Sequence, residues 1–203
     1  MKWIYRCFYL LIKKIIQWYE KMAANDLSAK IVLGENSHVI CPSHPRRIVN
    51  CQTPDKLCIG KNTNIRGYLL VYPYGEGISI GNNSYIGENS IIRSANKILI
   101  GDNVLIAHNV TIIDTDSHEI DYEERANSFM ELIDKGIPEK EGNCKTAPII
   151  IKDYAWISYN VSILKGVTIG MGAIIGCGSV VTSDIPDFTL AVGNPCKVIK
   201  YLK

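Results

Sequence analysis

Histidine is the side chain that most readily takes up and releases a proton near neutral pH. The chain has four histidines: His38, His44, His108 and His118. His118 lies in the string IIDTDSHEID, close in sequence to Asp114 and Asp116. A nearby carboxylate can orient an imidazole ring or offset the charge of an imidazolium. The sequence does not choose between the two aspartates for this part. His118 is therefore the candidate general base, with Asp114 or Asp116 as its catalytic partner.

The chain around these residues repeats with a period of six. A branched apolar residue returns at every sixth position over most of the length, with three extra residues between Val71 and Ile80 and a shift of two after Ile98. These residues are Ile59, Ile65, Val71, Ile80, Ile86, Ile92, Ile98, Ile100, Ile106, Ile112, Ile151, Ile157, Ile163, Ile169, Ile175 and Val181. Neither an α-helix, with a period of 3.6, nor a simple strand, with a period of two, gives this pattern.

A repeat of six describes one flat face of a three-sided parallel β-coil with about eighteen residues per turn. Each apolar residue then stacks on its equivalent one coil below, ~4.8 Å away, and builds an apolar column inside a prism. The next position after Ile112 in this series is occupied by His118. The candidate base thus stands where the ladder stops and the chain leaves the coil.

The composition indicates one globular domain with an appendage. Of the 203 residues, 47% are hydrophobic and 21% are charged, which is typical of a chain that buries a core. Seven cysteines without a CxxC pair disfavour a disulfide framework and favour a reducing cytosolic setting. No metal is expected, because their spacing matches no zinc motif. We predict a basic amphipathic helix over residues 1–24, a β-helix domain over 25–186 with a loop inserted at 119–146, and a tail over 187–203.

The first 22 residues place apolar side chains at helical spacing beside several lysines and an arginine. Lys13 and Lys14 interrupt the apolar stretch, so the segment fits neither a membrane-spanning helix nor a signal peptide. Two interpretations stay open. The helix packs on the prism or on a neighbouring subunit, or it lies in a membrane interface. We expect a cytoplasmic protein, and the second interpretation adds peripheral contact with the inner face of the membrane.

The break after Ile112 is followed by an acidic excursion over residues 119–146, with eight acidic and four basic side chains. A long excursion from a regular solenoid is usually functional or disordered. We expect this loop to fold over the site that binds the substrate of His118 or over a neighbouring subunit. Its negative charge disfavours a strongly anionic substrate held by the loop.

The last third of the chain contains WISYNVSILKGVTIGMGAIIGCGSVVTSDIPDFTLAVGNPCKVI. Together with the coil break at His118, this string resembles the hexapeptide-repeat acyltransferases, especially sugar O-acetyltransferases such as the galactoside and maltose enzymes and polysaccharide O-acetyltransferases. The resemblance covers about residues 59–200. It implies an all-β fold, a left-handed parallel β-helix, and a homotrimer with acetyl-CoA as co-substrate in the groove between adjacent prisms. It also matches His118 to the family's catalytic histidine.

The resemblance further implies which residues contact acetyl-CoA. Three positions match places where the galactoside family touches it: Tyr159, Cys177 and Thr182. Lys197 and Lys200 match tail arginines that face the nucleotide phosphates, and they keep the charge but lose the bidentate fork. Trp156 opens a coil directly after the excursion, and we expect it to pack near the same site.

Other positions depart from the family pattern or stay ambiguous. Ser183 stands where the family often has lysine, so one phosphate contact is missing, and Ser158 replaces a frequent glycine. Gly87 takes the place of a sugar-binding asparagine, which leaves Asn89, two residues later, as the candidate for a hydrogen bond to the substrate. His108 either contacts the acceptor or the pantetheine, or is an outward-facing strand residue.

The expected function is acetyl-CoA-dependent O-acetylation of a saccharide hydroxyl on a polysaccharide or cell-surface glycan building block. Transfer would be direct, in a ternary complex, with a histidine general base. Two alternatives stay open among enzymes: N-acetylation of an amino sugar, and acetylation of an antibiotic. The non-enzymatic alternative is a β-helix that serves as a scaffold. The expected partners are the homotrimer and a sugar or glycan, and no nucleic acid.

Overall fold

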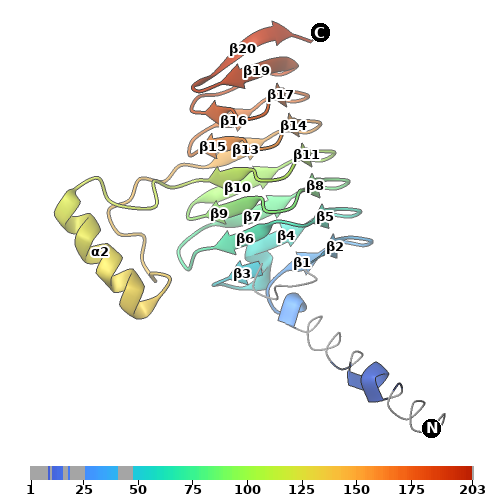
Figure 1. Ribbon diagram of the computed structural model, residues 1–203, viewed down its shortest axis with the longest axis vertical. Helices are drawn as coiled ribbons and strands as arrows, with labels where there is room; N and C mark the ends of the chain where they lie inside the picture. The colour runs from blue at the N-terminus through green and yellow to red at the C-terminus, as the bar shows by residue number, and fades with distance from the viewer. Residues whose placement is uncertain (1–8, 10, 16–17, 19–25, 41–47, 203) are drawn as a thin grey trace.

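The computed structural model describes residues 9, 11–15, 18, 26–40 and 48–202. In this range the chain winds through three sheets that form the faces of a prism (Figure 1). Sheet A contains β1 (Val32–Leu33), β4 (Leu57–Ile59), β7 (Gly77–Ile80), β10 (Lys97–Ile100), β13 (Ile149–Ile151) and β16 (Thr168–Ile169). Sheet B contains β2 (His38–Val39), β5 (Asn64–Ile65), β8 (Tyr85–Ile86), β11 (Leu105–Ile106), β14 (Trp156–Ile157), β17 (Ile174–Ile175), β19 (Thr189–Gly193) and β20 (Cys196–Tyr201). Sheet C contains β3 (Ile48–Asn50), β6 (Tyr68–Val71), β9 (Ile91–Ser94), β12 (Thr111–Ile113), β15 (Ser162–Leu164) and β18 (Val180–Val181).

The predicted apolar ladder is the core of this prism. Every residue of the ladder is buried, and neighbouring coils align them in parallel register, as where Ile106 pairs with Ile86 below and Ile157 above. The shift of two is explained by β10, which turns both Ile98 and Ile100 inward. Each buried isoleucine contributes about 1.5–3 kcal/mol relative to exposure, so the columns supply most of the driving force for folding.

The corners between the sheets repeat one backbone conformation. Asparagines with a positive φ of 53–58° occupy these turns: Asn36, Asn62, Asn83, Asn89, Asn103, Asn109 and Asn160. Asparagine tolerates this left-handed conformation better than most residues, because its short polar side chain can bond locally. Each turn redirects the chain from one sheet to the next with few residues, which keeps each coil in register with the next.

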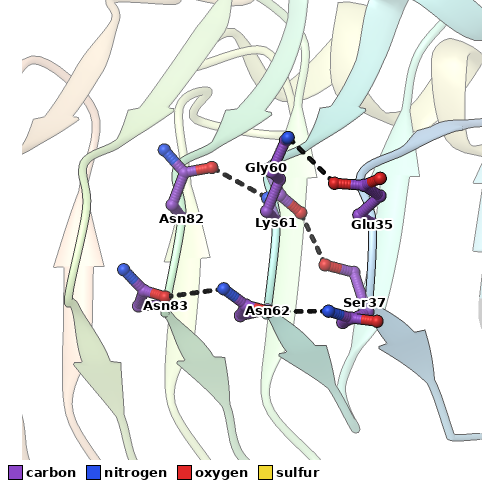
Figure 2. A network of polar contacts seen from close by, with 8 residues as sticks. Glu35, Ser37, Gly60, Lys61, Asn62, Asn82 and Asn83 are labelled. Carbon is purple, nitrogen blue, oxygen red and sulfur yellow. Dashed lines mark hydrogen bonds and ion pairs between the residues drawn. The ribbon is translucent and has the colours of Figure 1, made fainter.

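Polar side chains tie these turns together along the prism axis. Figure 2 shows the first coils, where the backbone N–H of Lys61 donates to Oδ1 of Asn82 at 2.8 Å. The same arrangement continues upward, because the N–H of Asn82 donates to Asp102 at 2.7 Å and the N–H of Asp102 donates to Asp153 at 2.9 Å. Turn N–H groups that have no partner in a neighbouring strand thus donate to side-chain oxygens of the coil above. These bonds avoid the free-energy cost of a buried N–H without an acceptor.

The structure differs from the sequence expectations at two places. The expected tail forms β19 and β20, an antiparallel pair that extends sheet B beyond β17. The expected loop at 119–146 contains the helix α2 (Tyr122–Lys135), which projects from the side of the prism in Figure 1. A short 3-10 turn, η2 (Pro54–Lys56), precedes β4.

Most of the predicted N-terminal helix lies outside the described residues, and residues 11–15 within it are helical. Among the described residues, no helix combines the length and the apolar content that crossing a bilayer requires.

The fold predicts opposite outcomes for two adjacent isoleucines in β17. Ile175→Asp puts a charge into the apolar column and should cost most of the stability, which for a domain is about 5–15 kcal/mol. Ile174→Asp is the matched control, because that side chain faces outward and is only partly buried. Circular dichroism and the soluble yield of the two variants measure the difference. A folded Ile175→Asp protein would contradict the stacked core.

Candidate functional site

His118 lies at the root of the excursion, just outside sheet C. The two sides of this root pair with each other: the N–H of Ala147 donates to the carbonyl of Asp114 at 3.0 Å, and the N–H of Asp116 donates to that of Lys145 at 3.0 Å. Ser117 has a φ of 67°, which is uncommon for a residue other than glycine and turns the chain outward. The His118 side chain is exposed as a result, as a residue that exchanges protons with a substrate must be.

Asp114 does not share this exposed position. It is fully buried, and its carboxylate accepts hydrogen bonds from the Ser94 hydroxyl at 2.8 Å, the Ala95 N–H at 2.7 Å and the Asn96 N–H at 3.0 Å. Burial raises the pKa of Asp114, and these hydrogen bonds oppose the shift. The Asp114 carboxylate thus bonds to the turn one coil below and holds it in place, and this structural role accounts for the residue without a part in catalysis.

Asp116 is the exposed carboxylate of the pair. Its Oδ1 lies 2.5 Å from Nζ of Lys165, in the turn that follows β15 one coil above. Both side chains are about one-third exposed, so water screens this ion pair and its contribution to stability is small. Two opposite charges therefore lie near His118. The Asp116 carboxylate is two residues before it in the chain, and the Lys165 ammonium is one coil above.

The helix α2 begins four residues after His118, and hydrogen bonds join it to the segment between them. Asp121 caps the helix, accepting hydrogen bonds from the N–H groups of Glu123 and Glu124. Nη1 of Arg125 donates to the carbonyl of Glu119 at 2.9 Å and to that of Ile120 at 2.9 Å. A hollow of about 310 Å³ opens between helix and histidine. Its lining consists of His118, Tyr122, Arg125, Ala126 and Phe129.

These helix residues were not predicted as part of the site. The sequence did carry a signal, because Asp121 followed three residues later by Glu124, with Gly136 after the last turn, is typical of a capped helix. The apolar residues at 122, 126 and 129 also follow helical spacing.

A second polar group lies beside sheet C, one coil below. The guanidinium of Arg93 stands over the ring of Tyr68, 5.8 Å from its centroid, and Tyr72 stacks on Tyr74 at 5.5 Å. Burial raises the pKa of Tyr72, and the Arg93 charge and its hydrogen bond to the phenol oppose that shift. Burial likewise raises the pKa of Tyr74. These phenols stay neutral and pack as aromatic surface.

The predicted donor-site residues divide between three places. His108, Tyr159 and Cys177 occupy equivalent turns of successive coils after sheet B. His108 stacks on Tyr159 with ring centroids 5.3 Å apart and 4° between planes. A hydrogen bond with the Cys177 side chain raises the pKa of Tyr159. His108 is therefore a corner residue packed on Tyr159 and not a plain strand residue, and the three make one exposed polar edge.

The remaining predicted residues lie elsewhere on the upper coils. Thr182 follows β18, at the opposite end of that strand from Cys177. Lys197 and Lys200 are exposed on β20, paired with Val192 and Leu190 of β19. Trp156 is about half exposed on the outer face of sheet B, in register with Leu105 and Ile174.

Asn89 lies one coil below His108, and its φ of 58° places it among the corner asparagines. This left-handed conformation explains why an asparagine stands at the position. Among the described residues, no three histidine, cysteine, aspartate or glutamate side chains come together as metal ligands would.

Comparisons with known proteins agree with this architecture. No family model matches the chain. The chain is 57% identical to a Staphylococcus aureus protein named "Putative acetyltransferase" over 60 residues. These residues are 30% of this chain and 30% of the relative. A similarly named Schizosaccharomyces pombe protein is 55% identical over 56 residues, 28% of this chain and 27% of the relative. The chain therefore matches less than a third of the length of these curated relatives.

Solved structures extend the similarity over most of the chain. A galactoside acetyltransferase in complex with coenzyme A is 33% identical, with a TM-score of 0.56, over 85% of this chain and 65% of that enzyme. A Vibrio cholerae hexapeptide-repeat acetyltransferase complexed with acetyl-CoA is 26% identical, with a TM-score of 0.54, over 91% and 78%. The neighbours are left-handed β-helix acetyltransferases, so the predicted fold class and the resemblance to hexapeptide-repeat acyltransferases are confirmed.

The hydrogen bonds of Asp114 predict a stability difference between the two candidate carboxylates. Asp114→Ala leaves three donors without their acceptor and should lower the free energy of unfolding by about 2–4 kcal/mol. Asp116→Ala removes only a screened ion pair and should cost about 1 kcal/mol or less. Urea denaturation of both variants tests this, and equal losses would remove the structural role assigned to Asp114.

Proposed function

We propose that this chain, which shares the left-handed β-helix of the hexapeptide-repeat acetyltransferases, transfers an acetyl group from acetyl-CoA to a saccharide hydroxyl. The observation that carries the proposal is the position of His118. It is an exposed histidine at the break of the coil, held by the paired root of the excursion and facing a hollow large enough for a small ligand. Similarity to acetyltransferases with bound coenzyme supports the choice of donor.

His118 would act as the general base of this reaction. Its neutral imidazole takes the proton of the acceptor hydroxyl as the acceptor oxygen bonds to the acetyl carbonyl carbon. The carbon–sulfur bond of the thioester then breaks, and the proton held on His118 passes to the leaving thiolate, which departs as the free thiol. Asp116 remains as the proposed carboxylate partner, because it is exposed and two residues before His118, whereas Asp114 is occupied elsewhere.

Acetyl-CoA would lie along the upper coils. The exposed edge formed by Tyr159 and Cys177 offers a phenol and small turns to a thin chain bearing amides. Thr182, directly after β18 of sheet C, would contribute a further contact. Trp156, on sheet B, would pack near the pantetheine. Lys197 and Lys200 put two positive charges on the terminal strand, which suits the phosphates of the nucleotide.

We also propose that the active unit is a homotrimer in which acetyl-CoA occupies the groove between adjacent prisms. Exposed apolar side chains on the outer face of sheet B, Leu105 and Trp156 among them, support an assembly that covers this face. His108 and Asn89, on the lower part of the polar edge, are proposed to contact the acceptor or the pantetheine from that groove.

The direct test of the base is His118→Ala. Turnover should fall by about 10²-fold or more while the affinity for acetyl-CoA is retained, since the imidazole moves a proton and does not hold the donor. The measurement is release of free thiol from acetyl-CoA with a panel of methyl pyranosides and amino sugars. His38→Ala is the control, because His38 is an exposed histidine on β2, in the first coil. Comparable turnover in the two variants would remove His118 from the mechanism.

The two terminal lysines predict a charge effect on donor binding. Exposed ion pairs are worth about 0.2–1 kcal/mol each, so Lys197→Ala with Lys200→Ala should weaken acetyl-CoA binding about 2- to 30-fold. The loss should shrink as salt is added, because salt screens these charges in the parent protein. Calorimetric titration at two ionic strengths measures this, with Lys140→Ala in the excursion as a control. An unchanged dissociation constant would place the phosphates elsewhere.

A further inference from the structure

The excursion carries a helix whose aromatic face is left uncovered beside the proposed base. Tyr122, Arg125, Ala126 and Phe129 are spaced by three, four and seven residues, so they share one face of α2. With His118 they line the hollow of about 310 Å³. Tyr122 is 68% exposed and Phe129 is 50% exposed, although both belong to a folded helix.

This helix is held in place without burying any of its residues in the prism. A helix of 14 residues is marginal in water on its own, so contacts at its start must fix it. The Asp121 cap, the Arg125 contacts with the carbonyls of Glu119 and Ile120, and the bond from the Ser128 hydroxyl to Glu119 at 2.8 Å join its first turns to the segment after His118. The start of the helix is therefore fixed to the segment that directly follows His118.

Ala126 is the smallest side chain that lines the hollow, and it lies between Tyr122 and Phe129 on the helix face. The two aromatic side chains and His118 line the hollow with it. Arg125 adds N–H donors beyond the Nη1 group that bonds the backbone carbonyls. An apolar pocket with a few convergent polar groups is the usual form of a small-molecule site.

We propose that this hollow is the acceptor subsite, and that it takes an uncharged pyranose ring whose flat apolar face lies against Tyr122 or Phe129. The inference rests on the proposed acetyl transfer and names the residues that choose its acceptor. Ring hydroxyls reach Arg125, and the hydroxyl to be acetylated points at His118. The first helical turn carries Glu123 and Glu124, which disfavour a carboxylated or phosphorylated sugar at short range.

Filling the hollow tests this proposal without touching the base. Ala126→Leu should raise the KM for a methyl pyranoside by at least about tenfold, within the ~10–200-fold range by which such pockets discriminate. The KM for acetyl-CoA should stay within about twofold of the parent value, since the substitution leaves the proposed donor edge alone. Asn127→Leu is the matched control, because it adds the same side chain to the next, exposed position of the helix. Leucine is a good helix former, so α2 should persist in both variants.

A second pair of variants separates the aromatic surface from bulk. Phe129→Leu keeps an apolar side chain but removes the ring, and should raise the pyranoside KM about 3- to 10-fold. Met130→Leu, next to it and 57% exposed, lies outside the lining of the hollow and should leave that KM unchanged.

The outcomes distinguish the subsite from the reaction. No thiol release by the parent protein with any methyl pyranoside would contradict the proposed function itself. An active parent with the same pyranoside KM in Ala126→Leu and Asn127→Leu would overturn the subsite alone. A smaller oligomer mass for Ala126→Leu, but not for Asn127→Leu, would show that a second copy of the chain fills the hollow, and would also overturn it.

Discussion

Each coil of this protein must lie in parallel register on the coil below, and almost every other feature follows from that constraint. The strands from β1 to β18 are two to four residues long, too short to hold a sheet by themselves. Their stability comes from side chains that repeat at the same place in each coil: isoleucine inside, asparagine in left-handed turns, and aspartate or asparagine oxygens that accept turn N–H groups from below. A change in one coil therefore disturbs its two neighbours more than the rest of the molecule.

The same constraint decides where chemistry can be added. An insertion that shifted the register would misplace every coil after it, so a long excursion has to leave and return at the same height. The chain does this with a paired root between residues 114–116 and 145–147, which the hydrogen bonds of the Asp114 carboxylate tie to the coil below. His118 and α2 stand on that root. The rigid prism thereby fixes the position of the proposed base, while the excursion carries the proposed acceptor subsite.

The sequence was sufficient for the repeat and for the place of His118, because both depend on periodicity. A buried isoleucine at every sixth position leaves few other folds, and the break after Ile112 marks the excursion directly. It was insufficient where the outcome depends on three-dimensional pairing. Asp114 and Asp116 are alike in sequence, and only the turn at Ser94–Asn96 separates a buried structural carboxylate from an exposed one. The terminal segment with Pro195 did not read as strand, yet β19 and β20 pair because β17 offers an open sheet edge.

The central claim is that the upper coils form a donor site for acetyl-CoA which serves His118. The most direct measurement is a calorimetric titration of the full chain with acetyl-CoA, with the oligomer mass determined in the same buffer. The account predicts saturable binding at one site per chain, with a dissociation constant on the order of 1–100 μM, in the lower part of the usual range of substrate affinities. A folded protein that gives no heat of binding with acetyl-CoA would contradict the donor site and, with it, the role of His118 as an acetyl-transfer base.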